Sequence, residues 1–158
     1  MSLLDALFRH GHLRTLDHAL AQSLRRLDAS TPDTVLAAAA LASLAVAKGH
    51  AGLSLREPRA LLRAAAPIDW PSADAWRACL AASRWVATPD DADAIADPHA
   101  PLVLEQDLLY LRRYREYERA LALGLQRLAA HAVPATGIDA LAPVFAQLSP
   151  PAAHAAHQ

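Results

Sequence analysis

Residues 101–120 read PLVLEQDLLYLRRYREYERA and carry three structural signals in succession. The apolar run 101–104 predicts a short strand, the polar residues 105–107 predict a turn, and the apolar run 108–111 predicts a second strand. At Arg112 the pattern changes to the three- and four-residue spacing of a helix. We therefore expect a β-hairpin that leads directly into a helix.

The helix predicted from Arg112 to about His131 has two different faces. Its apolar residues recur every three or four positions, which indicates a face that packs in the core; they are Tyr114, Tyr117, Leu121, Leu125 and Leu128. Opposite charges stand three or four apart on the other face, in the pairs Arg112 with Glu116, Arg115 with Glu118, and Glu116 with Arg119. Because such pairs neutralise the arginines, a salt-bridged solvent face is favoured over a phosphate-binding surface.

Further upstream, the stretch VLAAAALASLAVAKG at 35–49 is apolar on nearly every side. A helix sustains this composition only when other elements surround it. Thr31 followed by Pro32 predicts the start of the helix, and Gly49 predicts its end. We expect Val35 to Lys48 to form the central core helix.

Five further segments carry helical spacing or capping signals: 2–10, 15–28, 57–66, 73–84 and 139–148. Four of them begin near a side chain that can cap a helix, namely Ser2, Thr15 or Asp17, Ser72, and Asp139. Short extended segments are predicted at 52–55 and at 85–87, the latter as a third strand beside the hairpin. The predicted fold class is mainly α, a compact domain of about seven helices with a small β-hairpin near residues 101–111.

Composition narrows the class of protein. The 158 residues fit one domain, and 54% are hydrophobic but only 5% aromatic, which favours helices. The 15 basic and 16 acidic residues give a net charge of −1, so the global charge does not support nucleic-acid binding. The single cysteine, Cys79, excludes an intrachain disulfide and a multi-cysteine zinc site. With no export or membrane segment evident, we expect a cytoplasmic protein.

Motifs for catalysis or metal binding are missing from the sequence. Lys48, the one lysine, follows no glycine-rich loop, so a phosphate-cradling P-loop is absent. Among the eight histidines, His10 and His12 stand near a turn, and His154 and His157 lie in a tail without acidic or cysteine companions, so solvated or capping histidines are favoured over a metal site. The aspartates of 88–100 lack the glycine and glutamate of a calcium loop. No reaction and no cofactor is assigned to this chain from its residues.

Four segments carry a family resemblance in their order and spacing. They are LDHALAQSL at 16–24, VLAAAALASLAVAKGHAGLSL at 35–55, WRACLAASRWV at 76–86, and PLVLEQDLLYLRRYREYERALA at 101–122. The more specific pieces are Lys48-Gly49-His50 with the leucines after it, and the hairpin with Leu109-Tyr110-Leu111. Together these segments resemble the N-terminal domain of RecD, the alpha subunit of bacterial exodeoxyribonuclease V, the RecBCD helicase-nuclease.

The resemblance implies a place in a larger enzyme. Residues 1–149 would form the RecD-like domain, and 150–158 a tail or the start of a linker to a motor domain that lies beyond this sequence. The parent subunit would be an ATP- and magnesium-dependent helicase of 5′ to 3′ polarity that acts in recombinational repair of double-strand breaks. The chain itself would bind no cofactor and would not be an enzyme. It would dock onto a RecC-like subunit, in a complex that also contains a RecB-like subunit. It would contact DNA only through that complex, and no membrane partner is expected.

Docking interfaces depend mostly on a few aromatic and arginine side chains. The candidate interface residues in this sequence are Trp70, Trp85, Arg112 and Arg113. Two alternatives stay open at this point. In the first alternative to docking, the chain is a DNA-binding module that uses the helix 112–119. In the second, it is a self-contained helical adaptor or small enzyme unrelated to helicases.

Overall fold

The computed structural model describes residues 2–62, 68–90 and 95–131. It divides into two compact units, 1–123 and 124–158, which are treated separately below. The α-helices described are α1 (Leu3–Arg9), α2 (Thr15–Leu27), α3 (Asp33–Ala47), α4 (Ala73–Ala81) and α5 (Arg112–Ala130). The strands are β1 (Leu53–Ser54), β2 (Val86–Ala87), β3 (Leu102–Glu105) and β4 (Leu108–Leu111), and one 3-10 helix, η1, covers Pro58–Leu61.

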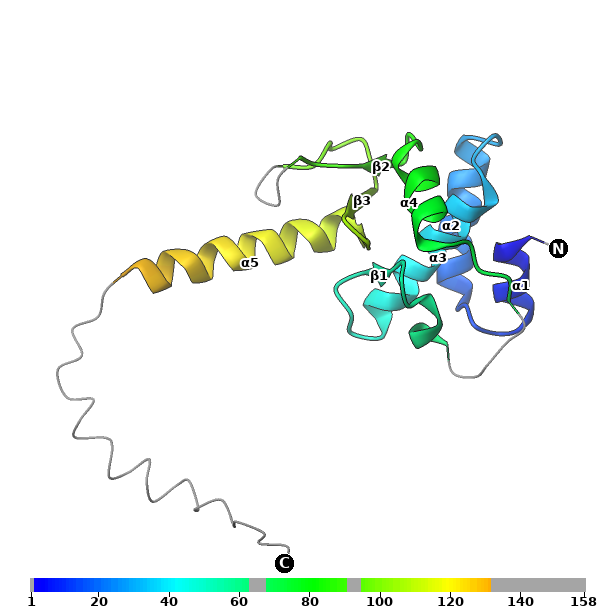
Figure 1. Cartoon of the computed structure of the whole chain (residues 1–158), viewed down its shortest axis with the longest axis horizontal. Helices are drawn as coiled ribbons and strands as arrows, with labels where there is room; N and C mark the ends of the chain where they lie inside the picture. Colours follow the sequence, from blue (N-terminus) through cyan, green and yellow to red (C-terminus); the bar gives the residue numbers. More distant parts are fainter. Residues whose placement is uncertain (1, 63–67, 91–94, 132–158) are drawn as a thin grey trace, which may run out of the picture. The chain divides into compact units, whose positions relative to one another are not determined.

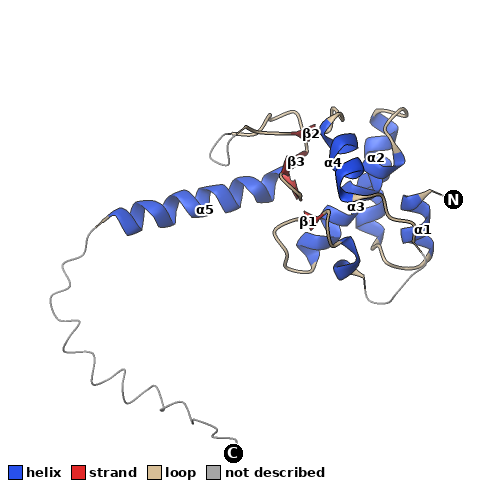
Figure 2. Cartoon of the chain, in the orientation of Figure 1, coloured by secondary structure: helices blue, strands red, loops and turns tan. Residues whose placement is uncertain are grey.

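The predicted fold class, mainly α with about seven helices, is wrong. Over the described ranges the fold has five α-helices and a four-stranded mixed sheet. Figure 2 shows these short strands in red among the helices. The segment 57–66 was expected to be a helix, but its described part forms only a 3-10 turn that begins at Pro58. The predicted helix at 139–148 and the proposed boundary at 149 lie outside the described residues.

The predicted hairpin is confirmed and forms the middle of the sheet. The strand order is β1-β4-β3-β2, and β3 pairs antiparallel with β4 in the register that places Leu104 opposite Leu109. The third strand expected near 85–87 is also present, as β2, which runs parallel to β3. Because a strand of two residues is too short to show an alternating pattern, the sequence did not predict that β1 and β2 together extend the hairpin to a four-stranded sheet.

Gly52 permits the close approach of β1 to β4. A Cβ atom built at this position would lie 2.6 Å from the carbonyl oxygen of Leu109, well inside van der Waals contact. Only glycine fits a backbone this close to its neighbour. The pairing of Leu53 with Leu109 that follows in the chain depends on this missing side chain.

Helix α3 is the central core helix, as the sequence predicted. Every residue from Val35 to Ala45 is buried, on all sides of the helix. The elements around it are α1, α2, α4, β1, β4 and η1 (Figure 1). The helix ends before Gly49, which has a φ of +85° that suits glycine. At its other end the N-cap position is occupied by Pro32, one residue after Thr31, so the predicted cap does not form; the hydroxyl of Thr31 accepts a hydrogen bond of 2.8 Å from Trp85 Nε1.

The capping predictions have mixed outcomes. Ser2 and Ser72 accept hydrogen bonds from the first turns of α1 and α4, as expected. Helix α2 instead starts after Arg14, whose backbone N–H donates to the carboxylate of Asp17 over 3.0 Å. Asp17 therefore belongs to the first turn of α2, and its side chain is fully buried.

The hairpin turn is tied to the helical layer by Asp107. This carboxylate accepts hydrogen bonds from Arg77 of α4, at 2.9 Å from Nε and 2.6 Å from Nη2, and from Arg56. Hydrogen bonds from Arg56 and then from Arg77 lower the pKa of Asp107. The neighbouring Gln106 has a φ of +53°, which completes the turn. The hairpin, and therefore the start of α5, is held in one orientation by these contacts.

Within the described ranges, no helix combines the length and the apolar character needed to cross a membrane.

Candidate functional site

The first turns of α5 are held against the hairpin by a buried arginine. Arg115 is only 2% exposed and donates to Glu105 of β3, at 2.8 Å from Nε and 2.6 Å from Nη2. Its Nη1 lies 3.1 Å from Oε1 of Glu116. The backbone N–H of Arg112 also donates to the carbonyl of Pro101 over 2.9 Å. A buried guanidinium with two carboxylates fixes both the position and the rotation of the helix start.

Glu116 extends this network to a second segment of the chain. It accepts hydrogen bonds from Arg119 at 3.0 Å and from the backbone N–H of Ala96 at 3.4 Å. Burial raises the pKa of Glu116, but hydrogen bonds from Arg119, Ala96 and Arg115 outweigh it, so that the pKa is lowered overall. The carboxylate is therefore charged near neutral pH. The predicted pair Glu116 with Arg119 is confirmed.

The apolar residues of α5 in the first unit lie in solvent. Tyr114 is 40% exposed, Tyr117 is 55% exposed and Leu121 is 59% exposed. The prediction that this face packs in the core is wrong. Its three- and four-residue spacing is the same as that of a core helix, so spacing alone does not distinguish a face covered by its own chain from one left open. We name Tyr114, Tyr117 and Leu121 the α5 apolar face. In the second unit, Leu125 and Leu128 are likewise exposed.

Two aromatic rings and an arginine are ordered on this face. Tyr114 and Tyr117 pack edge to face, with ring centroids 6.2 Å apart and planes at 84°. Arg113 donates from Nε to the hydroxyl oxygen of Tyr117 over 2.8 Å, and its Cζ lies 5.4 Å from the centroid of that ring. The guanidinium of Arg113 is thus placed by a neutral ring and not by a carboxylate.

The arginines of α5 do not form a phosphate-binding stripe. Arg115 is buried against Glu105, and Arg119 pairs with Glu116. Of the four arginines from 112 to 119, only Arg113 is classed as exposed. A backbone-tracking surface for nucleic acid needs several cations open to solvent. The arginines are therefore balanced by glutamates, as expected, but of the three predicted pairs the described contacts include only Glu116 with Arg119, and Arg115 is buried instead of lying on a solvent face.

Trp85 and Arg112, two of the candidate interface residues, both flank the end of the sheet where β3 begins and β4 ends. The carbonyl of Trp85 accepts from the N–H of Leu102 at the start of β3, and Arg112 follows the end of β4, the neighbouring strand. Both side chains are half-buried. Trp85 packs against the core and donates to Thr31, which gives it a structural role. The Nε atom of Arg112 is buried, and no residue that the structure describes gives it a hydrogen-bond partner.

Trp70 lies in a different part of the fold. Its ring centroid is 6.1 Å from that of Trp76, which is fully buried in α4. It also borders a cavity of about 560 Å³ lined by residues of 55–60 and 70–73, among them Pro58 and Pro71. The indole N–H of Trp70 is enclosed, and it has no hydrogen-bond partner among the described residues. No contact described for Trp70 reaches α5, so the four candidates do not form one surface.

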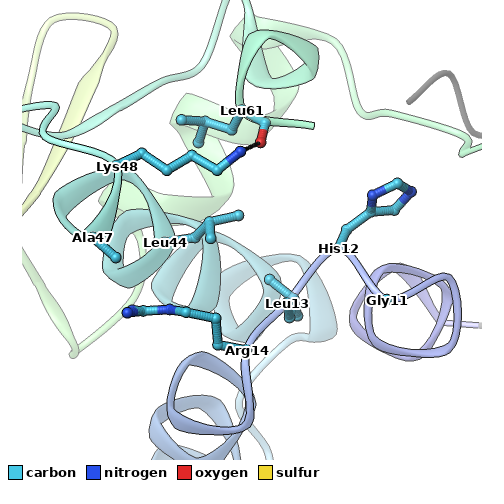
Figure 3. A pocket seen from close by; sticks show the side chains of 8 residues that line it. All are labelled: Gly11, His12, Leu13, Arg14, Leu44, Ala47, Lys48 and Leu61. Carbon is cyan, nitrogen blue, oxygen red and sulfur yellow. Dashed lines mark hydrogen bonds between the residues drawn. The ribbon is translucent and has the colours of Figure 1, made fainter. Parts of the chain in front are cut away.

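A second cavity, of about 330 Å³, lies where the segment 11–14 between α1 and α2 and the end of α3 approach Leu61 of η1 (Figure 3). Two cationic side chains, Arg14 and Lys48, line it together with His12, but the three do not converge. Lys48 donates to the carbonyl of Leu61 across the cavity, and Arg14 pairs with the buried Asp17. Figure 3 shows Arg14 and His12 pointing in opposite directions. Since the lysine is already occupied and no glycine-rich loop is present, this cavity does not fit a nucleotide phosphate.

The imidazole of His12, beside this cavity, favours its neutral form. Burial, followed by the positive charges of His10 and Lys48, lowers the pKa of His12. The described part of the chain brings no three His, Cys, Asp or Glu side chains together in a way that could hold a metal ion. On the α5 apolar face, by contrast, large apolar and aromatic side chains are grouped in solvent beside Arg113, and grouped exposed apolar residues are typical of surfaces that bind another macromolecule.

The chain matches one family model. This model, described as the RecBCD enzyme subunit RecD, N-terminal domain, covers residues 9–110, well over half of the 158 residues. The matched range includes the core helix α3, the sheet and most of the hairpin, and ends two residues before α5. No curated protein matches the chain.

Proposed function

Because the chain belongs to the family of RecD N-terminal domains, we propose that it docks a RecD-like subunit onto another subunit of the RecBCD enzyme, with RecC as the partner. The observation that supports docking is the α5 apolar face, where three large side chains between Tyr114 and Leu121 are exposed on a helix held rigidly at its start. Exposed apolar residues that are grouped, and not scattered, mark interaction sites.

The wider role follows from the parent enzyme. In this proposal the complex unwinds and degrades broken DNA ends in recombinational repair, in the cytoplasm. ATP and magnesium would act in the motor of the parent subunit, and no residue of this chain is assigned to them. The chain contributes assembly, and its side chains contribute binding energy instead of catalysis.

Direct DNA binding by α5 is the weaker proposal. Three of the four arginines between 112 and 119 are buried, half-buried or paired with glutamates. A helix of this kind releases few counterions from DNA, so its affinity would be low and nearly independent of salt.

Co-expression tests the docking proposal. We expect tagged chain 1–158 to co-purify with the RecC subunit of the same organism in a fixed stoichiometry, and Leu121→Glu to abolish this while the variant remains folded. An exposed alanine, changed as Ala19→Glu on α2, is the matched control. Failure of the unmodified chain to retain RecC at low salt would contradict the proposal.

A further inference from the structure

We propose that Arg113 and Tyr117 form a preassembled anchor that receives a carboxylate of the partner protein. This inference rests on the proposed docking function and names the chemistry that the partner must supply. In the docked complex, the guanidinium of Arg113 binds an aspartate or glutamate side chain, while Tyr114 and Leu121 contact apolar side chains around it.

The end of the Arg113 guanidinium that carries Nη1 and Nη2 is open to a ligand. Its Nε is used by the hydroxyl of Tyr117, at 2.8 Å, and the ring lies under the guanidinium with its centroid 5.4 Å from Cζ. The two terminal nitrogens, Nη1 and Nη2, have no partner among the described residues. A guanidinium offers two parallel N–H groups from this end, which is the arrangement that a carboxylate accepts.

The surrounding charges favour a carboxylate over a phosphate. Six arginines of the described ranges have a carboxylate within the molecule: Arg14, Arg25, Arg56, Arg77, Arg115 and Arg119. Arg113 has none there, although Glu116 is only three residues away, because Glu116 is engaged by Arg115 and Arg119. Glu118 directly follows Tyr117 and is exposed, and the ion pairs described for the neighbouring arginines Arg115 and Arg119 are with Glu105 and Glu116. An extended polyanion such as DNA would bring further phosphates close to the carboxylate of Glu118, which repels them. A partner protein can present a single carboxylate to Arg113 and no negative charge to Glu118.

Preassembly makes the anchor effective. Ordering a free arginine and a free tyrosine at an interface costs conformational entropy, which lowers the affinity. Here the side chains already hold each other, Tyr114 packs against the edge of Tyr117, and Arg115 with Glu105 fixes the helix below them. Tyrosine and arginine are also the residue types that dominate interface energies. The anchor therefore gains most of its contact energy without a large ordering cost.

The test measures the affinity of the full chain for purified RecC at low and at moderate salt. We expect Arg113→Gln to weaken binding by about tenfold at low salt and to flatten its salt dependence. Arg113→Lys keeps the charge but loses the two-pronged contact, so it should weaken binding by a smaller factor. Tyr117→Phe keeps the ring and removes the acceptor for Nε, and we expect a loss of about twofold to fivefold. Arg26→Gln, which removes an exposed arginine on α2, is the control and should leave the affinity unchanged.

The outcomes separate this inference from the docking function. If the unmodified chain binds RecC and Arg113→Gln binds as well as Arg26→Gln, the anchor is wrong and docking stands. If the unmodified chain does not bind, both fall. If Arg113→Gln loses affinity for single-stranded DNA but not for RecC, the anchor receives phosphate, and the inference is likewise overturned. Thermal melts of all variants show whether the fold is kept, which is expected because these side chains are exposed.

Discussion

Arg115 of α5 and Glu105 of β3 are joined by two hydrogen bonds, of 2.8 Å and 2.6 Å, although Arg115 is only 2% exposed. This contact connects the hairpin, most of which the family model covers, to the helix that carries the α5 apolar face. The position of the binding face therefore depends on one buried charge.

Removing the partner of that charge should destabilise the domain. We expect Glu105→Gln to lower the free energy of unfolding by about 2–3 kcal/mol, because it leaves the guanidinium of Arg115 buried with less compensation. Chemical denaturation measures the change. Glu118→Gln, which alters an exposed glutamate on the same helix, should shift the free energy by less than about 0.5 kcal/mol. Equal stability of the two variants would show that the contact does not hold α5.

The buried carboxylate of Asp17 should contribute to the free energy of unfolding while it is ionised. It is fully buried and accepts hydrogen bonds from Arg14 and from Ser43, the latter at 2.7 Å. We expect Asp17→Asn to lower the free energy of unfolding by about 2–3 kcal/mol at pH 7, since the amide cannot accept from all these donors. Denaturation curves at neutral pH check this value.

The pH dependence has a definite sign. Burial raises the pKa of Asp17, but the hydrogen bonds from Arg14 and Ser43 outweigh it and hold the pKa below that of an unfolded aspartate. The stabilisation is therefore complete above about pH 4 and is lost as the pH falls through the folded-state pKa. The difference between wild type and Asp17→Asn should shrink steadily in acid. A difference that stays constant down to the acid transition would contradict this assignment.

Two glycine substitutions should have opposite effects. Gly52→Ala places a Cβ 2.6 Å from the carbonyl oxygen of Leu109, so we expect a loss of about 1–3 kcal/mol as β1 and β4 move apart. Gly124→Ala adds a methyl group to α5 where no atom lies within 4 Å. It should stabilise the helix by about 0.5–1 kcal/mol. Thermal melts of the two variants test the prediction, which fails if Gly52→Ala melts at or above the wild-type temperature.

The alanines of α3 should resist enlargement. Ala40 is fully buried within a helix that is enclosed on all sides. Ala40→Leu should lower the free energy of unfolding by about 1–3 kcal/mol through overpacking. Ala39→Leu is expected to act in the same way. The exposed Ala19 of α2 provides the control, because Ala19→Leu adds the same atoms in solvent and should be nearly neutral.

The α5 apolar face should affect binding without affecting stability. Leu121 is 59% exposed, so Leu121→Ser should change the melting temperature little. The same change should weaken the affinity for RecC by about tenfold, because a large apolar contact is lost from the interface. A variant that melts early and binds normally would place Leu121 in the folded core and not in the interface.

The sequence predicted the parts of the fold that have strong local patterns. The hairpin was predicted from two apolar runs around a polar turn, and α3 from its apolar character on every side. The number of helices was overestimated, because the segment 57–66 has helical composition, yet its described part forms a 3-10 turn at Pro58. The size of the sheet was underestimated, since β1 and β2 each have two residues and are recognised only by their partners.

The binding face was harder to predict. Tyr117 and Leu121 have the spacing of core residues, and only the surrounding structure shows that the described chain leaves them exposed. The partner of Arg115 was also missed, because Glu105 is ten residues away and pairs across a turn instead of along a helix. The hydrogen bond from the indole of Trp85 to Thr31, which spans 54 residues, could not be predicted either, and a role of Trp85 at an interface stays a prediction. Long-range contacts of this kind leave no signal in local spacing.

The most direct test of docking is a titration of purified chain 1–158 into purified RecC, followed by calorimetry. Our account predicts a one-to-one complex with a dissociation constant on the order of micromolar or tighter, which Leu121→Ser and Arg113→Gln weaken and Arg26→Gln does not. The absence of a complex at tens of micromolar protein and low salt, from a chain shown to be folded, would contradict it.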